Sequence, residues 1–107
     1  MTQPTSKRLA FLQKLTSQGS TDPMAFYGLA MEYRSLGLYD EALTTFTLLR
    51  ESHPSYVAMY LMCGQMLEQM NRRADARGWY ETGIVRARET HNTHAAGELE
   101  TALSALE

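Results

Sequence analysis

The sequence of 107 residues contains a single cysteine, Cys63, and this scarcity removes two classes of site at once. No disulfide can form within the chain, and a metal or redox motif of paired cysteines is excluded. The sequence also lacks an uninterrupted apolar run of about 18 residues, which a membrane-spanning helix requires. At the N-terminus, no apolar core is followed by the small residues of a secretory signal. These absences predict a cytoplasmic protein with no membrane segment.

A strong charge of one sign is missing as well. The chain has 10 Lys and Arg against 12 Asp and Glu, which leaves a formal net charge of −2 at pH 7. Domains that bind nucleic acid are usually basic overall, so we expect neither a nucleic-acid partner nor an anionic membrane surface. The contents of hydrophobic residues, 44%, and of charged residues, 21%, are typical of an ordinary folded domain.

Patterns typical of strands are also scarce, because Thr, Val and Ile nowhere alternate with polar residues over a segment. Helical spacing is frequent instead. Residues 24–36 place apolar side chains three or four positions apart, and residues 39–49 do so again. Gly37 separates the two stretches and favours a left-handed helix end. The sequence therefore predicts two helices joined by a tight turn.

The same pattern returns 34 residues later, with the physical type of each position kept. Bulky apolar residues recur where a helix fills a core, small residues recur where two helices approach closely, and Asn71 recurs where Gly37 ends a helix. The matching pairs are Phe26 and Tyr60, Leu29 and Cys63, Ala30 and Gly64, Tyr33 and Leu67, Gly37 and Asn71, Ala42 and Ala76, Phe46 and Tyr80, and Leu49 and Gly83.

This period and these positions resemble the tetratricopeptide repeat, a helix-turn-helix unit of 34 residues. Residues 23–56 match the first copy and residues 57–90 the second, in which Arg88 stands at the closing proline and predicts a longer second helix. The resemblance implies one all-α domain over residues 1–107. It would be a short right-handed superhelix of antiparallel helix pairs, an α-solenoid of about six helices.

The N-terminal flank is predicted to be a capping helix over residues 5–18, because its Leu9, Phe11, Leu12 and Leu15 are typical of an amphipathic helix. Such a helix can cover the exposed end of the first repeat. The segment is also poor in acidic residues and mildly basic, as an organellar transit peptide would be, so that alternative stays open.

The C-terminal flank, residues 92–107, is predicted to be a solvating helix that begins at Asn92 or Thr93. Its apolar stripe comprises Ala95, Leu99, Ala102, Leu103 and Leu106. We do not expect a third repeat, because the 34-residue comparison places Glu98 where the earlier copies have Ala30 and Gly64. A charged side chain would be costly in that close contact.

The first helices of tetratricopeptide repeats line a concave groove, and this resemblance implies a binding face for a peptide or amphipathic helix of a protein partner. The implied lining is mostly apolar and comprises Met24, Tyr27, Met31, Arg34, Ala58, Leu61, Met62, Gln65 and Gln69. Methionine repacks readily around apolar ligands. The alternatives are that these side chains are interior filler or lie under the terminal helices, or that the groove or an end helix forms a homodimer contact.

A second candidate surface is basic and comprises Arg73, Arg77 and Arg88, flanked by Arg72 and Arg86. It could receive an acidic partner, or it could be a solvated outer face, since Asp75 and Glu81 interrupt the charge. Trp79 similarly has two interpretations, a buried contact under the last helix or an exposed anchor.

Catalytic residues that converge are hard to find in this sequence. His91 and His94 lie at a predicted helix boundary without nearby cysteines or paired carboxylates, and Cys63 falls at a core position. We therefore expect a non-catalytic adaptor or scaffold with no cofactor and no metal.

Overall fold

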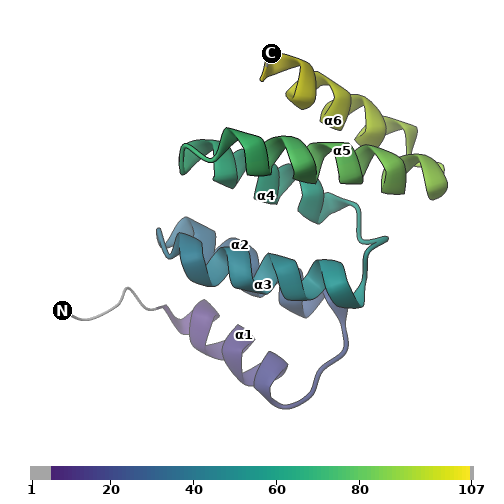
Figure 1. The fold of residues 1–107 in the computed structure, drawn as a ribbon. Helices are drawn as coiled ribbons and strands as arrows, with labels where there is room; N and C mark the ends of the chain where they lie inside the picture. Colours follow the sequence, from purple (N-terminus) through teal and green to yellow (C-terminus); the bar gives the residue numbers. More distant parts are fainter. Residues whose placement is uncertain (1–5, 107) are drawn as a thin grey trace. The chain divides into compact units, whose positions relative to one another are not determined.

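The computed structural model describes residues 6–106, and within that range it contains α-helices and no strand (Figure 1). The six helices are α1 Lys7–Ser17, α2 Pro23–Ser35, α3 Tyr39–Ser52, α4 Ala58–Gln69, α5 Arg73–Glu89 and α6 Thr93–Ala105. The predicted all-α class with about six helices is confirmed. The outer limits of the predicted terminal helices, residues 5 and 107, lie outside the described residues.

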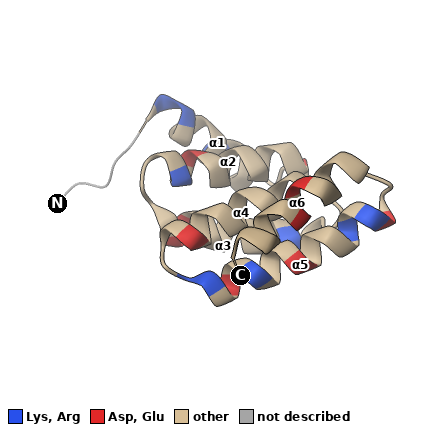
Figure 2. Cartoon of the chain, turned by 90° about the horizontal axis from the view of Figure 1, so that it is seen from above, with Lys and Arg blue, Asp and Glu red and all other residues tan. Residues whose placement is uncertain are grey.

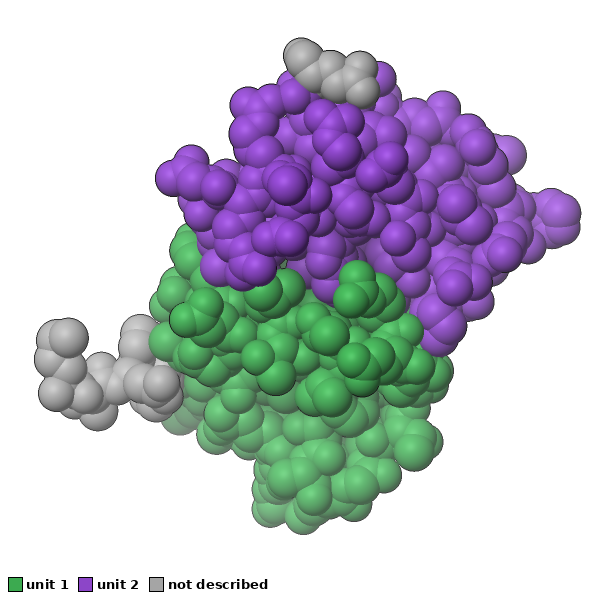
Figure 3. Space-filling model, viewed as in Figure 1, with its two compact units in different colours: residues 1–53 green, residues 54–107 purple. Residues whose placement is uncertain are grey.

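The chain divides into two compact units, Met1–His53 and Pro54–Glu107, which Figure 3 shows in different colours. Helices α1, α2 and α3 belong to the first unit, and α4, α5 and α6 to the second. The assignment of the whole chain to one domain with two repeats and two caps stays a prediction.

Four of the six helices end in the same way, with one residue in the left-handed conformation. These residues are Gly19, Gly37, Asn71 and His91, with φ angles of 85°, 77°, 60° and 57°. After each one, the next backbone N–H donates to the carbonyl five residues earlier, as from Leu38 to Tyr33 at 2.9 Å and from Arg72 to Leu67 at 2.8 Å. This bonding satisfies carbonyls that a helix end leaves unpaired. The predicted helix ends at Gly37 and Asn71 are confirmed.

Side-chain caps fix three of the helix starts. The N–H of Leu9 donates to Oγ of Ser6 at 2.9 Å, and the N–H of Met24 donates to Oδ1 of Asp22 at 2.9 Å. The N–H of Ala95 donates to Oδ1 of Asn92 at 3.0 Å. Each cap satisfies a donor that the first helical turn leaves free. Of the two residues predicted to begin the last helix, Asn92 is therefore the cap.

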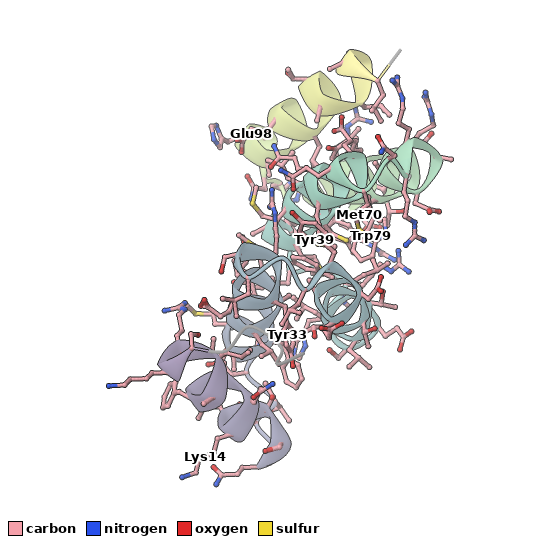
Figure 4. The ribbon with its side chains drawn as sticks, turned by 90° about the vertical axis from the view of Figure 1, so that its left-hand side faces the viewer. Lys14, Tyr33, Tyr39, Met70, Trp79 and Glu98 are labelled. Atoms are coloured by element: carbon pink, nitrogen blue, oxygen red, sulfur yellow. The ribbon has the colours of Figure 1, made fainter. Side chains whose placement is uncertain are left out.

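The first unit has a small apolar core between α1 and α2. Leu9 and Leu12 of α1 pack with Leu29 of α2, and Tyr33 and Leu36 cover them. The amide of Gln13 donates to the hydroxyl of Tyr33 at 3.0 Å, and Arg8 pairs with Glu32 at 3.4 Å. Figure 4 labels Tyr33 on α2. Between α2 and α3, the rings of Tyr27 and Phe46 meet edge to face at 6.5 Å.

The second unit is held together by tyrosines that lie against glycines. A Cβ atom on Gly64 of α4 would lie 2.2 Å from the ring of Tyr80 of α5, and one on Gly83 of α5 would lie 2.5 Å from Cβ of Tyr60 of α4. Only glycine permits so close an approach of the two helices. The ring of Tyr60 also contacts that of Trp79, which is 6% exposed, with the ring centroids 5.9 Å apart and the planes tilted by 50°.

The hydroxyls of both tyrosines are satisfied within the second unit. Tyr60 donates to the backbone carbonyl of Pro54 at 2.6 Å, and Tyr80 donates to the carboxylate of Glu68. A buried hydroxyl without a partner would be costly, so these bonds permit the two rings to be fully buried.

Helix α5 is 17 residues long against 14 in α3, as the absence of a closing proline predicts. Helix α6 packs on α5 at Gly83, where a Cβ atom would lie 3.0 Å from Cδ1 of Leu99. Among the helices of residues 6–106, none is long and apolar enough to cross a bilayer.

We predict that Gly64→Ala and Gly83→Ala each lower the free energy of unfolding by about 1–3 kcal/mol, because the added methyl group displaces a buried ring. Gly78→Ala on α5 is the matched control. A Cβ at Gly78 meets nothing within 4 Å, so alanine there should stabilise the helix by about 0.5–1 kcal/mol. Urea unfolding followed by circular dichroism measures the free energy of unfolding of all three variants. Equal unfolding midpoints would contradict the assignment of Gly64 and Gly83 as contact positions.

Candidate functional site

The side chains predicted to line a groove on α4 lie on its open face. Ala58 and Gln69 are exposed, and Leu61, Met62 and Gln65 are half-buried. The opposite face of α4 carries residues that are buried in the core, among them Tyr60, Cys63 and Gly64. Helix α4 therefore has one face buried in the core and an opposite face that is half-buried or exposed.

A groove of about 740 Å³ runs along this open face, between α4 and α6. Its lining comprises Leu61, Gln65, Thr93, His94, Gly97, Glu98, Thr101, Ala102 and Ala105. The volume lies within the range typical of ligand sites in proteins. Of the predicted groove residues, the structure thus brings Leu61 and Gln65 into one cavity. The other seven lining residues belong to α6 and were not anticipated.

The contribution of α6 was missed because the 34-residue comparison does not apply to this helix. The buried residues of α6, Ala96 and Leu99, stand 34 positions after Met62 and Gln65, which are only half-buried on α4. The buried side chains of α6 are Ala96 and Leu99, whereas Glu98 is exposed at the groove. The charge of Glu98 is therefore not placed in a close contact between helices, as the sequence comparison had suggested. A signal was present in the small residues Gly97, Thr101 and Ala105, which recur every four positions.

The groove carries an acidic group. Glu98 and His94 are the ionisable residues of the lining, with Oε1 of Glu98 3.3 Å from Nε2 of His94. Both side chains are well exposed, at 50% for Glu98 and 87% for His94. Figure 4 shows Glu98 on α6. No lysine or arginine contributes to the lining, so a ligand in this groove meets carboxylate charge.

The predicted groove residues of α2 belong to the first unit. Met24 is 68% exposed, and Tyr27, Met31 and Arg34 are half-buried along the same helix. Part of the ring of Tyr27 is used against Phe46. The interpretation that these side chains and those of α4 line one shared groove stays a prediction.

Two of the three residues of the predicted basic surface attach α6 to α5. Arg73 donates to the backbone carbonyl of Leu106 at the end of α6, and Arg88 pairs with Glu100 at 2.9 Å. Figure 2 shows basic and acidic positions following one another along α5. The basic surface as a partner site stays a prediction, and Arg73 and Arg88 have structural contacts that such a partner would have to replace.

Acidic neighbours on the same helical segment pair with the two flanking arginines. Arg72 lies 2.8 Å from Asp75, and Arg86 lies 3.0 Å from Glu89. The hydrogen bond and the charge of Glu89 raise the pKa of the Arg86 guanidinium. Such exposed pairs contribute little to stability individually.

The residues considered for chemistry have other environments. His91 is exposed and forms the left-handed end of α5, and Cys63 is fully buried in α4. Within residues 6–106, no three His, Cys, Asp or Glu side chains come together as a metal site requires.

The helix pairs, the glycine contacts and the groove define a helical-repeat protein. No protein-family model matches the sequence, and no curated protein matches it either. Among solved structures, the chain is similar to a tetratricopeptide repeat domain protein from Salinibacter ruber. The solution structure of that protein is 35% identical, with a TM-score of 0.77 over 80% of this chain and 87% of that one. A crystal structure of a tetratricopeptide repeat domain protein from the same organism gives 34% identity and a TM-score of 0.74 over 79% and 94%. The chain belongs to the tetratricopeptide-repeat family.

Two more distant structures share the fold. A protein from Bordetella parapertussis is 22% identical, with a TM-score of 0.80 over 95% of this chain and 89% of that one. PcrH, solved in complex with the chaperone-binding region of PopD, is 19% identical, with a TM-score of 0.84 over 92% and 74%.

We predict that His91→Gly raises the free energy of unfolding by about 0.5–1 kcal/mol, because glycine adopts the left-handed conformation without the cost that a side chain imposes. A β-branched residue in the same place, His91→Val, should destabilise the protein. Thermal unfolding of the two variants tests the role of His91 as a helix end, and the opposite order of stability would refute it.

Proposed function

We propose that the protein is a non-catalytic interaction module that holds a peptide segment or amphipathic helix of a partner protein in the groove between α4 and α6. The observation that supports this most directly is the groove itself, which two predicted residues, Leu61 and Gln65, line together with most of one face of α6. Apolar and small side chains provide contact area, and Gln65, Thr93 and Thr101 provide hydrogen-bonding groups at its walls.

The chemistry of the lining favours binding over catalysis. Acid and base catalysts usually sit in partly desolvated sites where their ionisation is tuned. The two ionisable lining residues, His94 and Glu98, are instead exposed to solvent. Their exposure supports a role in recognition.

The complex of PcrH with a region of PopD gives this proposal a precedent. A chain with the same fold is there seen with a segment of another protein. We propose the same kind of ligand here, a segment of a protein partner, without proposing the same partner.

An alternative is self-association, which the exposure of large apolar side chains in the first unit favours. Phe11 on α1 is 62% exposed and Met24 on α2 is 68% exposed. A contact between copies would remove these exposed apolar side chains from water. Light scattering over a range of concentrations separates the two, since a monomer at every concentration would contradict self-association.

We predict that Gly97→Leu abolishes peptide binding without loss of stability. A Cβ at Gly97 meets nothing within 4 Å, so the leucine fills open space in the groove and not a packed contact. Gly78→Leu is the matched control, because Gly78 lies equally open on α5 and outside the lining. Peptides selected from a displayed library against the wild-type protein, measured by isothermal titration calorimetry, should bind Gly78→Leu and not Gly97→Leu.

Gly97 also lines a second cavity, of about 340 Å³, at the turn between α5 and α6. A second variant, Thr101→Phe, separates the two sites, because Thr101 lines the groove and does not line this second cavity. Undiminished binding by both groove variants would refute the proposed site. Amide chemical shifts of the wild-type protein should change on α4 and α6 when peptide is added.

A further inference from the structure

The groove between α4 and α6 has an uneven charge that selects among the segments it could hold. We propose that its partner segment is a basic amphipathic α-helix, with Lys or Arg beside its apolar face. This inference rests on the proposed function and specifies the chemistry of the ligand at the same site.

The charge of the lining is the first argument. Glu98 is its one acidic residue, and no lysine or arginine lies in the lining to balance it. Its neighbour in the lining is His94, at 3.3 Å, which pairs with it as an ion only when protonated. The groove therefore offers a carboxylate to an incoming cation, and complementary charge favours basic segments over acidic ones.

The arginines of α5 do not provide the missing positive charge. Arg88 pairs with Glu100, and Arg73 donates to the carbonyl of Leu106. Both contacts join α5 to α6, and neither arginine belongs to the groove lining. Glu100, at the contact between α5 and α6, pairs with the guanidinium of Arg88. Glu98, in the groove, pairs with His94.

The shape of the α6 wall favours a helical ligand. Gly97, Thr101 and Ala105 lie four residues apart along it, so their small side chains form one row on the same face. The lining extends from Thr93 to Ala105, the whole of α6, which is about 18 Å at 1.5 Å per residue. A row of small residues lets the side-chain ridge of a second helix approach closely.

A peptide that binds in an extended conformation would need the edge of a β-sheet to pair with. Residues 6–106 contain no strand whose edge could pair with it. An apolar helix face against Leu61, Ala102 and the small row, with a cation over Glu98, satisfies both the shape and the charge of the groove.

We test this with three designed peptides of about five helical turns that share one apolar face and carry flanking Lys, Gln or Glu. Binding is measured by fluorescence anisotropy at low salt. We expect the Lys peptide to bind about two- to fivefold more tightly than the Gln peptide, and the Glu peptide to bind most weakly. Added salt should reduce these differences.

The charge-reversal variant Glu98→Lys should invert the order of the Lys and Glu peptides. Glu81→Lys is its matched control, because Glu81 is exposed on α5, lies outside the lining and changes the net charge equally. The control should keep the wild-type order. Equal affinity for all three peptides, or inversion by Glu81→Lys as well, would overturn the proposal of a basic partner.

The same measurements distinguish a failure of the proposed groove from a failure of its proposed charge preference. If Gly97→Leu binds the Lys peptide as the wild-type protein does, then the groove is not the site, and both proposals fall. If light scattering shows a dimer that Gly97→Leu dissociates, a second copy of the chain occupies the groove, and the basic partner is overturned. If all three peptides bind alike and Gly97→Leu abolishes their binding, the groove stands as a binding site and only the charge preference fails.

Discussion

The close contacts at Gly64 and Gly83 are the constraint on which the second unit depends. Because these residues have no Cβ, the rings of Tyr80 and Tyr60 lie directly against the facing helix. Their hydroxyls then reach Glu68 and the carbonyl of Pro54, so the large side chains are buried with their polar atoms satisfied. Leu99 of α6 packs against the same Gly83, and this contact sets α6 beside α4. The groove between α4 and α6 is a consequence of this arrangement.

Helix α6 is attached on one side and open on the other. Leu99 and Leu106 are buried, Arg88 pairs with Glu100, and Arg73 binds the carbonyl of Leu106. The groove side of the helix carries small residues with no such contacts, and a Cβ at Gly97 would meet open space. Glycine at an exposed helical position costs about 1 kcal/mol relative to alanine. Packing of α6 does not require that cost, and the ligand proposed for the groove would account for it.

The sequence predicted those parts of the structure that depend on short-range pattern. Gly37 and Asn71 ended helices as expected, and Gly64, a small residue expected where two helices approach closely, lies against the ring of Tyr80. The groove was predicted only in part. Leu61 and Gln65 follow from the repeat, but the α6 wall depends on where that helix begins relative to α5. The left-handed His91 could not be anticipated either, because histidine adopts that conformation only when the turn around it requires it.

The distribution of charge in the second unit follows from the same attachment of α6. A helix with little apolar surface to bury needs polar contacts to stay in place, and the arginines of α5 provide them at Glu100 and Leu106. Arginine suits such contacts because its planar guanidinium donates in fixed directions. Since these guanidinium groups point to the seam between α5 and α6, the carboxylate on the neighbouring face, Glu98, has no arginine or lysine beside it in the groove lining. The groove lining thus carries one carboxylate and no lysine or arginine, and the basic partner proposed for it would place a positive charge beside Glu98.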